Sequence, residues 1–146
     1  DTLVLARSGV GSLGKCAVYL DNDYMNVSCF VDRIVLNGIS PFYVDIFFKS
    51  KFGKLQIERL ESGVSGTTNV SFDEIKSIKI PLLSDVIQKS MEKKHKEMHH
   101  YHQLAMNAKK FQNTYLYQKN IAKAELLLKD LIQKTEEVIR GERKSI

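Results

Sequence analysis

The fold of this chain is decided by residues 56–83, whose sequence is QIERLESGVSGTTNVSFDEIKSIKIPLL. The stretch begins with the end of an amphipathic helix, in which Ile57 and Leu60 are the apolar positions. It then enters a loop of Gly, Ser, Thr and Asn over residues 62–69, a composition that is typical of turns. A helix is therefore expected to end close to residue 62.

The second half of this stretch predicts where the mixed part of the fold ends. Ser71 and Glu74 have the spacing of a capping box, which predicts one short helical turn. A short strand is expected at residues 78–80, and Pro81 ends it. Because the sequence after Pro81 has helical periodicity for about sixty residues, a compact domain passes here into a long helical arm.

The residues before this stretch predict a small β-rich unit. Strands are expected at residues 2–6, 15–20 and 27–36, and a Gly-rich turn over residues 9–14 joins the first two. Ser40 and Pro41 are suited to the N-cap and the first position of a helix. Apolar residues then recur at helical spacing, with a break expected near Gly53; they are Val44, Phe47, Phe48, Phe52, Leu55 and Leu60.

The arm contains two apolar seams that do not share one phase. The first seam consists of Met91, Met98, Tyr101, Ala105 and Ala108, and the second consists of Ile121, Ala124, Leu128, Leu131, Thr135 and Val138. Continuing the first seam leads to Gln112 and Lys119 rather than to the second seam, which predicts a break near residues 112–118. We therefore expect an α+β fold, with a small mixed, β-rich domain over residues 1–83 and a two-helix, coiled-coil-like arm over residues 84–146.

The net charge of +5 lies entirely in the arm. Residues 1–83 hold nine Lys or Arg and nine Asp or Glu, whereas residues 84–146 hold thirteen and eight. A basic total therefore does not by itself place nucleic acid on the small domain. One local cluster there, formed by Lys49, Lys51, Lys54 and Arg59 and offset by Glu58, suits either a phosphate-facing surface or an ordinary solvated helix face.

Composition also indicates the compartment. No apolar run approaches the ~20 residues that cross a bilayer, and the first residues lack the basic start of a signal peptide. Cys16 and Cys29 are therefore expected to be buried, reduced thiols of a cytoplasmic protein. Since the chain opens directly into a strand pattern without Met, we expect it to be part of a longer protein.

Two patterns suggest chemistry but fit it poorly. Residues 9–16, GVGSLGKC, resemble a phosphate-binding loop, yet Cys16 stands where a magnesium-binding Ser or Thr is needed, and a strand pattern follows instead of a helix. His95, His99 and His102 cluster on the arm, but two His at one helix spacing fall short of a zinc site. No nucleophile elbow or methyltransferase motif is present, so we expect a non-catalytic chain without metal or cofactor.

The order of features in residues 1–83 resembles the C-terminal part of the target-recognition domain of type I restriction–modification DNA specificity subunits, a domain that has a longer N-terminal part in that family. That family has an Arg-Ser-Gly turn and a Gly-Lys pair after its opening strand, matched here by Arg7, Ser8, Gly9, Gly14 and Lys15. It also has a Ser-Gly-x-x-Gly-x-x-Asn-hydrophobic-Ser loop, matched by residues 62–71, and an Ile-Lys-x-Ile-x-Ile-Pro-Leu ending, matched by residues 75–82. The longer, His-rich arm looks more like the recognition domain fused to some adenine-specific DNA methyltransferases.

The resemblance implies sequence-specific binding of double-stranded DNA. Asn pairs bidentately with adenine, and Arg or Lys pairs with guanine. The residues implied to contact DNA are Arg7, Ser8, Lys15, Lys51, Lys54, Arg59, Ser65, Thr67, Thr68 and Asn69, the lysines and Arg59 mainly through phosphates. The loop residues among them are equally suited to satisfying turns through their own backbone.

The resemblance also implies partners for the arm. A methyltransferase subunit or domain is expected to dock on it, an endonuclease subunit is a further candidate, and the arm also suits a homodimer. The principal alternative is a coiled-coil scaffold or oligomerisation protein without DNA specificity, which would explain residues 84–140 but not the polar loops. A small nucleotide-binding enzyme is the other alternative.

Overall fold

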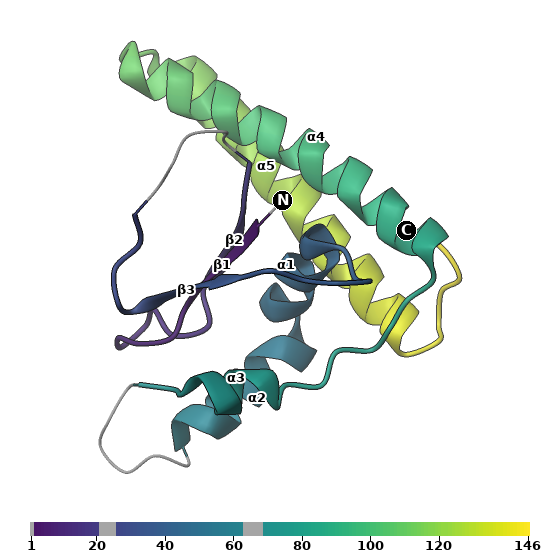
Figure 1. Ribbon diagram of the computed structural model, residues 1–146. Coiled ribbons are helices and arrows are strands. Elements are labelled where there is room, and N and C mark those ends of the chain that lie inside the picture. Colours follow the sequence, from purple (N-terminus) through teal and green to yellow (C-terminus); the bar gives the residue numbers. More distant parts are fainter. Residues whose placement is uncertain (1, 21–25, 63–68) are drawn as a thin grey trace. The chain divides into compact units, whose positions relative to one another are not determined.

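The computed structural model describes residues 2–20, 26–62 and 69–146, and the chain divides into two compact units, residues 1–82 and residues 83–146 (Figure 1). The first unit contains a three-stranded sheet and three short helices in its described part, and the second consists of two long helices. The expected α+β fold class, with a small mixed domain followed by a two-helix arm, is confirmed.

The sheet of the first unit is antiparallel and has the strand order β2-β1-β3. Strand β1 spans Thr2–Ala6, β2 spans Cys16–Tyr19 and β3 spans Val31–Ile34. The third strand is shorter than the predicted residues 27–36, because a turn in which the Val31 amide donates to the Ser28 carbonyl at 3.0 Å precedes it. The central position of β1 places its alternate side chains, Leu3 and Leu5, in the core.

The Gly-rich segment joins β1 and β2 as a hairpin, as the sequence predicts. The Ala6 amide donates to the Lys15 carbonyl, and the Gly14 amide donates to the Ala6 carbonyl, both at 2.8 Å. Gly14 has φ of +78°, and a Cβ atom there would lie 2.8 Å from Cγ2 of Ile57. Only glycine therefore fits both the backbone conformation and the close approach of the neighbouring helix.

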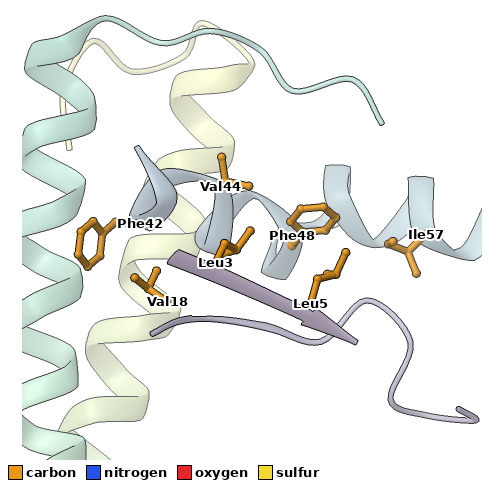
Figure 2. Close-up of a cluster of buried hydrophobic side chains, with 7 residues drawn as sticks. All are labelled: Leu3, Leu5, Val18, Phe42, Val44, Phe48 and Ile57. Atoms are coloured by element: carbon orange, nitrogen blue, oxygen red, sulfur yellow. The ribbon is translucent and has the colours of Figure 1, made fainter. Parts of the chain in front are cut away.

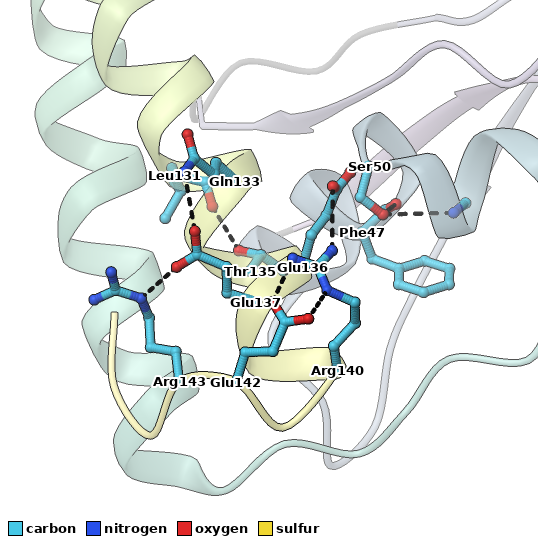
Figure 3. Close-up of polar contacts among 11 residues, drawn as sticks. Phe47, Ser50, Leu131, Gln133, Thr135, Glu136, Glu137, Arg140, Glu142 and Arg143 are labelled. Carbon is cyan, nitrogen blue, oxygen red and sulfur yellow. Dashed lines mark hydrogen bonds and ion pairs between the residues drawn. The ribbon is translucent and has the colours of Figure 1, made fainter.

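Helices α1 (Pro41–Lys49) and α2 (Lys51–Ser62) are separated at Ser50, so the predicted break near Gly53 is misplaced by three residues. Ser50 has an extended backbone, and its hydroxyl donates to the Phe47 carbonyl at 2.6 Å (Figure 3). Gly53 lies inside α2, where a Cβ atom would be 2.3 Å from the Phe47 carbonyl oxygen. The glycine permits the tight approach of the two helices rather than breaking one.

The core of the first unit lies between the sheet and helices α1 and α2. Figure 2 shows the side chains that form it, contributed by β1, β2, α1 and α2: Leu3, Leu5, Val18, Phe42, Val44, Phe48 and Ile57. Full burial of each such side chain stabilises the fold by about 1.5–3 kcal/mol. Partly buried residues that follow α3, including Ile78 and Ile80, pack against the same cluster.

Helix α3 (Phe72–Lys76) has the capping box that the sequence predicts. The Glu74 amide donates to the Ser71 hydroxyl, and the Ser71 amide donates to the Glu74 carboxylate at 2.7 Å. These bonds stabilise the ionised carboxylate and lower the pKa of Glu74. These reciprocal bonds therefore fix the backbone at Ser71, where the chain enters α3.

Residues 78–80 do not form the predicted strand. The backbone partner of Lys79 is a side chain: its amide donates to Gln56 Oε1 at 2.8 Å, and its carbonyl accepts from Gln56 Nε2 at 3.0 Å. The side-chain amide of α2 thus makes the pair of hydrogen bonds that a neighbouring strand would make. Further along, the Tyr43 hydroxyl donates to the Pro81 carbonyl at 2.7 Å.

The second unit is an antiparallel hairpin of α4 (Asp85–Lys110) and α5 (Thr114–Ile139). The turn occupies residues 111–113, at the beginning of the range in which the two seams predict a break, and Gln112 has a positive φ of 55°. Both seams contribute buried residues, namely Met91, Ala105, Ala108, Ala124, Leu131, Thr135 and Val138. The phase difference between the seams is thus produced by a reversal of the chain.

Ion pairs hold the residues that follow α5. Arg140 is the C-cap of α5, and Gly141 follows it with φ of +75°, the left-handed conformation that glycine favours just after a helix. Arg143 Nε lies 2.7 Å from the Glu137 carboxylate, and Arg140 contacts Glu142 at 2.6 Å (Figure 3). Hydrogen bonds from Arg143 and from Gln133 lower the pKa of Glu137.

Candidate nucleic-acid interface

The structure brings together two segments that the sequence singles out separately. Ser8 and Asn69 form an antiparallel β-bridge, and the Val70 amide donates to the Arg7 carbonyl at 2.9 Å. The residue that ends the polar loop therefore lies beside the turn that follows β1. Ser65, Thr67 and Thr68 belong to the same loop but lie outside the described residues.

The Arg7 side chain fastens this region to β3 and α3. Its Nη2 donates to the Cys29 carbonyl at 2.7 Å, its Nε lies 3.2 Å from Asp32 Oδ1, and its guanidinium lies 5.2 Å from the centre of the Phe72 ring. Asp32 is buried, and burial raises the pKa of its carboxyl group, an effect that Arg7 partly offsets. Arg7 thus contacts the segment before β3, β3 itself and α3, and so positions all three beside the Ser8–Asn69 bridge.

The predicted phosphate-binding residues lie on α2 and on the hairpin. Lys51, Lys54 and Arg59 are all exposed on α2, and Lys15 is exposed where the hairpin enters β2. Lys15 and Lys54 line one open cleft of about 520 Å³, whose other walls include the glycine turn and Glu58. The structure therefore brings Lys15 together with Lys54, whereas Lys51 and Arg59 are exposed on α2 but do not line this cleft.

A buried polar cluster next to this cleft was not predicted from the sequence. Asp45 is 1% exposed and forms an ion pair with Lys49 one turn later in α1. The Lys49 amine also donates to the Cys16 carbonyl at 2.7 Å, and the Cys16 thiol donates to Asp45 Oδ1 at 3.2 Å. The cluster joins α1 to the first residue of β2, directly after Lys15.

The two cysteines differ in environment. Burial raises the pKa of the Cys16 thiol, and the neighbouring Asp45 carboxylate adds to the shift. Cys29 is exposed on the segment before β3 and Cys16 is half-buried, which corrects the expectation that both thiols are buried. Neither cysteine forms a disulfide.

One sequence signal for the Asp45 cluster was available. Asp45 is the only charged residue between Pro41 and Phe48, a run that is otherwise apolar or aromatic, and Lys49 follows at the i+4 spacing of a helical ion pair. The partner on β2 is not visible from that spacing, because it depends on how α1 packs against the sheet.

The His cluster of the arm is divided between interior and surface. His95 is buried on the α4 seam between Met91 and Met98, whereas His102 is exposed; the rings of His99 and His102 stack at 6.3 Å. Within residues 2–20, 26–62 and 69–146, no group of three or more His, Cys, Asp or Glu has an arrangement suited to a metal ion.

Comparisons of the chain with protein-family models, curated proteins and solved structures found no match. None of the helices in the described part of the chain combines the length and the apolar character that crossing a membrane requires.

Proposed function

We propose that the first unit is a sequence-specific DNA-recognition module of a restriction–modification system, which directs an adenine methyltransferase or its associated endonuclease to a target site and is itself non-catalytic. The observation that carries the proposal is the Ser8–Asn69 bridge. The two motifs that resemble the specificity subunits are distant in sequence, and the bridge brings Ser8 of the first beside Asn69 of the second.

The chemistry of that surface suits base recognition in the major groove. An Asn side chain pairs bidentately with adenine, and Ser and Thr hydroxyls bond to any base edge. Asn69 is exposed at the end of its loop, and Ser65, Thr67 and Thr68 precede it in sequence. Because the Arg7 guanidinium contacts Asp32 and a carbonyl of its own chain, its contribution in this proposal is to orient the bridge.

The basic residues of α2 and the hairpin supply the sequence-independent part of the binding. Lys15, Lys51, Lys54 and Arg59 contact phosphates and fix the register of the module on the duplex. The first unit has no net charge. Its affinity for DNA then depends on these few local contacts rather than on a general positive field.

The arm, in this proposal, docks the methyltransferase component and sets the distance to a second recognition module. Its α4 and α5 seams are already buried in the chain, so a partner binds the outer surfaces of the hairpin. The same outer surfaces would serve a homodimer. Size-exclusion chromatography with light scattering, on the chain alone and with the cognate methyltransferase, distinguishes these two assemblies.

The test of base recognition is selection of bound sequences from a random duplex library. Wild-type protein is expected to enrich a short half-site, and Asn69→Ala to relax one position of it at a cost of about 1–3 kcal/mol. Arg33→Ala is the matched control, because Arg33 is exposed on β3 and pairs with Val4 on the sheet face opposite the core. Enrichment that is unchanged by Asn69→Ala would reject the recognition role of the loop.

The test of phosphate binding is a salt series on the selected duplex. Each Gln substitution at Lys15, Lys51, Lys54 or Arg59 is expected to weaken binding to all sequences equally and to reduce the salt slope by about 0.9. Arg33→Gln should leave the slope unchanged. If the chain does not bind duplex DNA even at low salt, the coiled-coil scaffold becomes the better account.

A further inference from the structure

The positive charge of the arm is concentrated around its turn. Residues 98–124 contain four lysines and no Asp or Glu, whereas the rest of residues 84–146 contain nine Lys or Arg and eight Asp or Glu. The first group therefore contributes +4, and all the remainder of the arm contributes +1. We call residues 98–124 the hairpin end.

The lysines of the hairpin end alternate with aromatic rings across both helices. Lys109 of α4 lies 5.7 Å from the centre of the Tyr117 ring of α5, and Lys123 of α5 lies 5.9 Å from the centre of the Tyr101 ring of α4. These reciprocal contacts follow from the antiparallel course of the two helices (Figure 1). Cations and rings of one helix thus face those of the other along the hairpin.

The large aromatic side chains at the turn are open to solvent. Phe111 is 84% exposed and Tyr115 is 71% exposed, and the four lysines, Lys109, Lys110, Lys119 and Lys123, are exposed as well. Two of these lysines border a shallow hollow of about 460 Å³, which is lined by Tyr101, Lys119, Asn120, Ala122, Lys123 and Leu126. Aromatic rings next to lysines, without acidic neighbours in sequence, are the combination that binds phosphates and stacks bases.

We infer that the hairpin end binds single-stranded nucleic acid without sequence preference. The four lysines contact successive phosphates, and Phe111 and Tyr115 stack against unpaired bases, since every base presents a π-face. A duplex offers phosphates but no free base faces, so the exposed rings favour the single strand.

An anionic membrane surface fits the hairpin end less well. A helix that lies in a membrane interface has a continuous apolar face opposite a basic one. Here the small apolar residues Ala105, Ala108 and Ala124 are buried on the seams of the hairpin. The exposed large apolar side chains of the hairpin end are interrupted in sequence by lysines and polar residues, which does not give a continuous lipid-facing stripe; they are Leu104, Phe111, Tyr115 and Leu116.

This inference does not depend on base recognition by the first unit, because it rests on residues of the second unit alone. The two are separated by variants of the whole chain. Gln at Lys109, Lys110, Lys119 and Lys123 removes the charge of the hairpin end. Gln at four exposed lysines elsewhere in the arm, Lys89, Lys93, Lys129 and Lys144, removes the same charge from the same unit and is the matched control.

The experiment is fluorescence anisotropy of a labelled oligothymidylate across a salt series. The hairpin-end Gln variant is expected to lose about 0.7 of salt slope for each contacting lysine, while the control variant keeps the wild-type slope. Arg at the same four positions preserves the charge and should preserve binding, and far-UV circular dichroism should show equal helicity in all variants. Gln at Lys15, Lys51, Lys54 and Arg59 in the first unit should leave oligothymidylate binding unchanged.

The stacking step has its own variant. Phe111→Ala with Tyr115→Ala is expected to weaken oligothymidylate binding about tenfold or more, and to affect binding of a blunt duplex much less. Equal weakening by the hairpin-end and control Gln variants would overturn the assignment of the site. Unchanged binding by the aromatic variant, or binding to phosphatidylserine vesicles in preference to oligothymidylate, would overturn the single-strand assignment.

Discussion

Substitution of Lys49 by Met should expose how strongly the buried cluster of the first unit depends on charge balance. The change removes the amine that pairs with Asp45 and that donates to the Cys16 carbonyl, while it keeps an unbranched apolar side chain of similar length. The Asp45 side chain is 2% exposed, whereas the Lys49 side chain is 29% exposed. The variant therefore leaves a carboxylate with almost no access to water and without its lysine partner, although the Cys16 thiol still donates to it.

Removal of one partner from a buried ion pair costs about 3–5 kcal/mol, most of it because the other charge is stranded. The value at Asp45 should lie near the lower end of this range, since the thiol remains 3.2 Å from Oδ1. Asp45→Asn should cost less, because the Lys49 amine is close enough to the surface to be hydrated. Lys49→Met should therefore destabilise the first unit more than Asp45→Asn, because the charge that it leaves behind is the more deeply buried one.

Native-state hydrogen exchange of peptides from α1 and β2 measures the change in the unit where it occurs. At neutral pH, Lys49→Met should accelerate exchange of the most protected amides by about a hundredfold or more, because 1.4 kcal/mol corresponds to a factor of ten. The stranded carboxylate takes up a proton more readily in the folded than in the unfolded state. Stability is therefore regained as the pH falls, and the effect should shrink at mildly acidic pH, after correction for intrinsic exchange.

Lys76→Met is the control, because Lys76 pairs with Asp73 in the same unit with both side chains largely exposed, and such pairs contribute about 0–1 kcal/mol. The reasoning is refuted if Lys49→Met and Lys76→Met have the same small effect. It is also refuted if the effect of Lys49→Met does not diminish with falling pH.

Three further outcomes follow from close contacts and from burial. Gly14→Ala should destabilise the first unit by about 1–3 kcal/mol more than Gly11→Ala in urea unfolding, because both positions have positive φ but only Gly14 has an α2 side chain 2.8 Å from the new Cβ. Gly→Ala inside a helix normally stabilises a protein by about 1 kcal/mol. Gly53→Ala should instead lower the melting temperature, because the new Cβ would lie 2.3 Å from a carbonyl oxygen of α1. A higher melting temperature would contradict this close approach. Iodoacetamide should alkylate Cys29 much faster than Cys16 in the native protein, since Cys29 is exposed and burial raises the pKa of the Cys16 thiol. The two rates should become equal only after unfolding. Mass spectrometry of the labelled peptides measures both rates.

The elements that the sequence predicts well are those whose signals are local. The capping box at Ser71 and Glu74 depends on four consecutive positions, and it is present with both of its hydrogen bonds. The glycine hairpin and the two-helix arm likewise follow from patterns within single segments. The arm turn at residues 111–113 was predictable because two regular seams cannot continue through one straight helix without a change of phase.

The predictions that were wrong concern positions where a distant residue decides the outcome. Residues 78–80 have a strand-like pattern, yet their hydrogen-bonding partner is the Gln56 side chain, which no periodicity reveals. Gly53 resembles a helix breaker, but it is required by the approach of the Phe47 carbonyl, while Ser50 makes the break. The exposure of Cys29 depends on the turn that precedes β3.

The candidate site was predictable in its parts but not in its arrangement. Arg7 and Asn69 were singled out on separate segments, and only the bridge between those segments makes them neighbours. Lys15 was grouped with the α2 cations by resemblance, and the cleft that it shares with Lys54 depends on the packing of the hairpin against α2. The Asp45 cluster was missed because half of it belongs to β2.

The ion pairs of the first unit that include a buried carboxylate, Arg7–Asp32 and Lys49–Asp45, are best explained by the geometry that they impose. A buried pair adds little net stability compared with well-packed apolar residues of the same volume. Arg7 and Asp32 lie beside the Ser8–Asn69 bridge, and Asp45 with its lysine is bonded to the residue that follows Lys15. Each pair therefore fixes the backbone next to a proposed DNA contact, where an error of position would weaken base or phosphate binding more than it would weaken the fold.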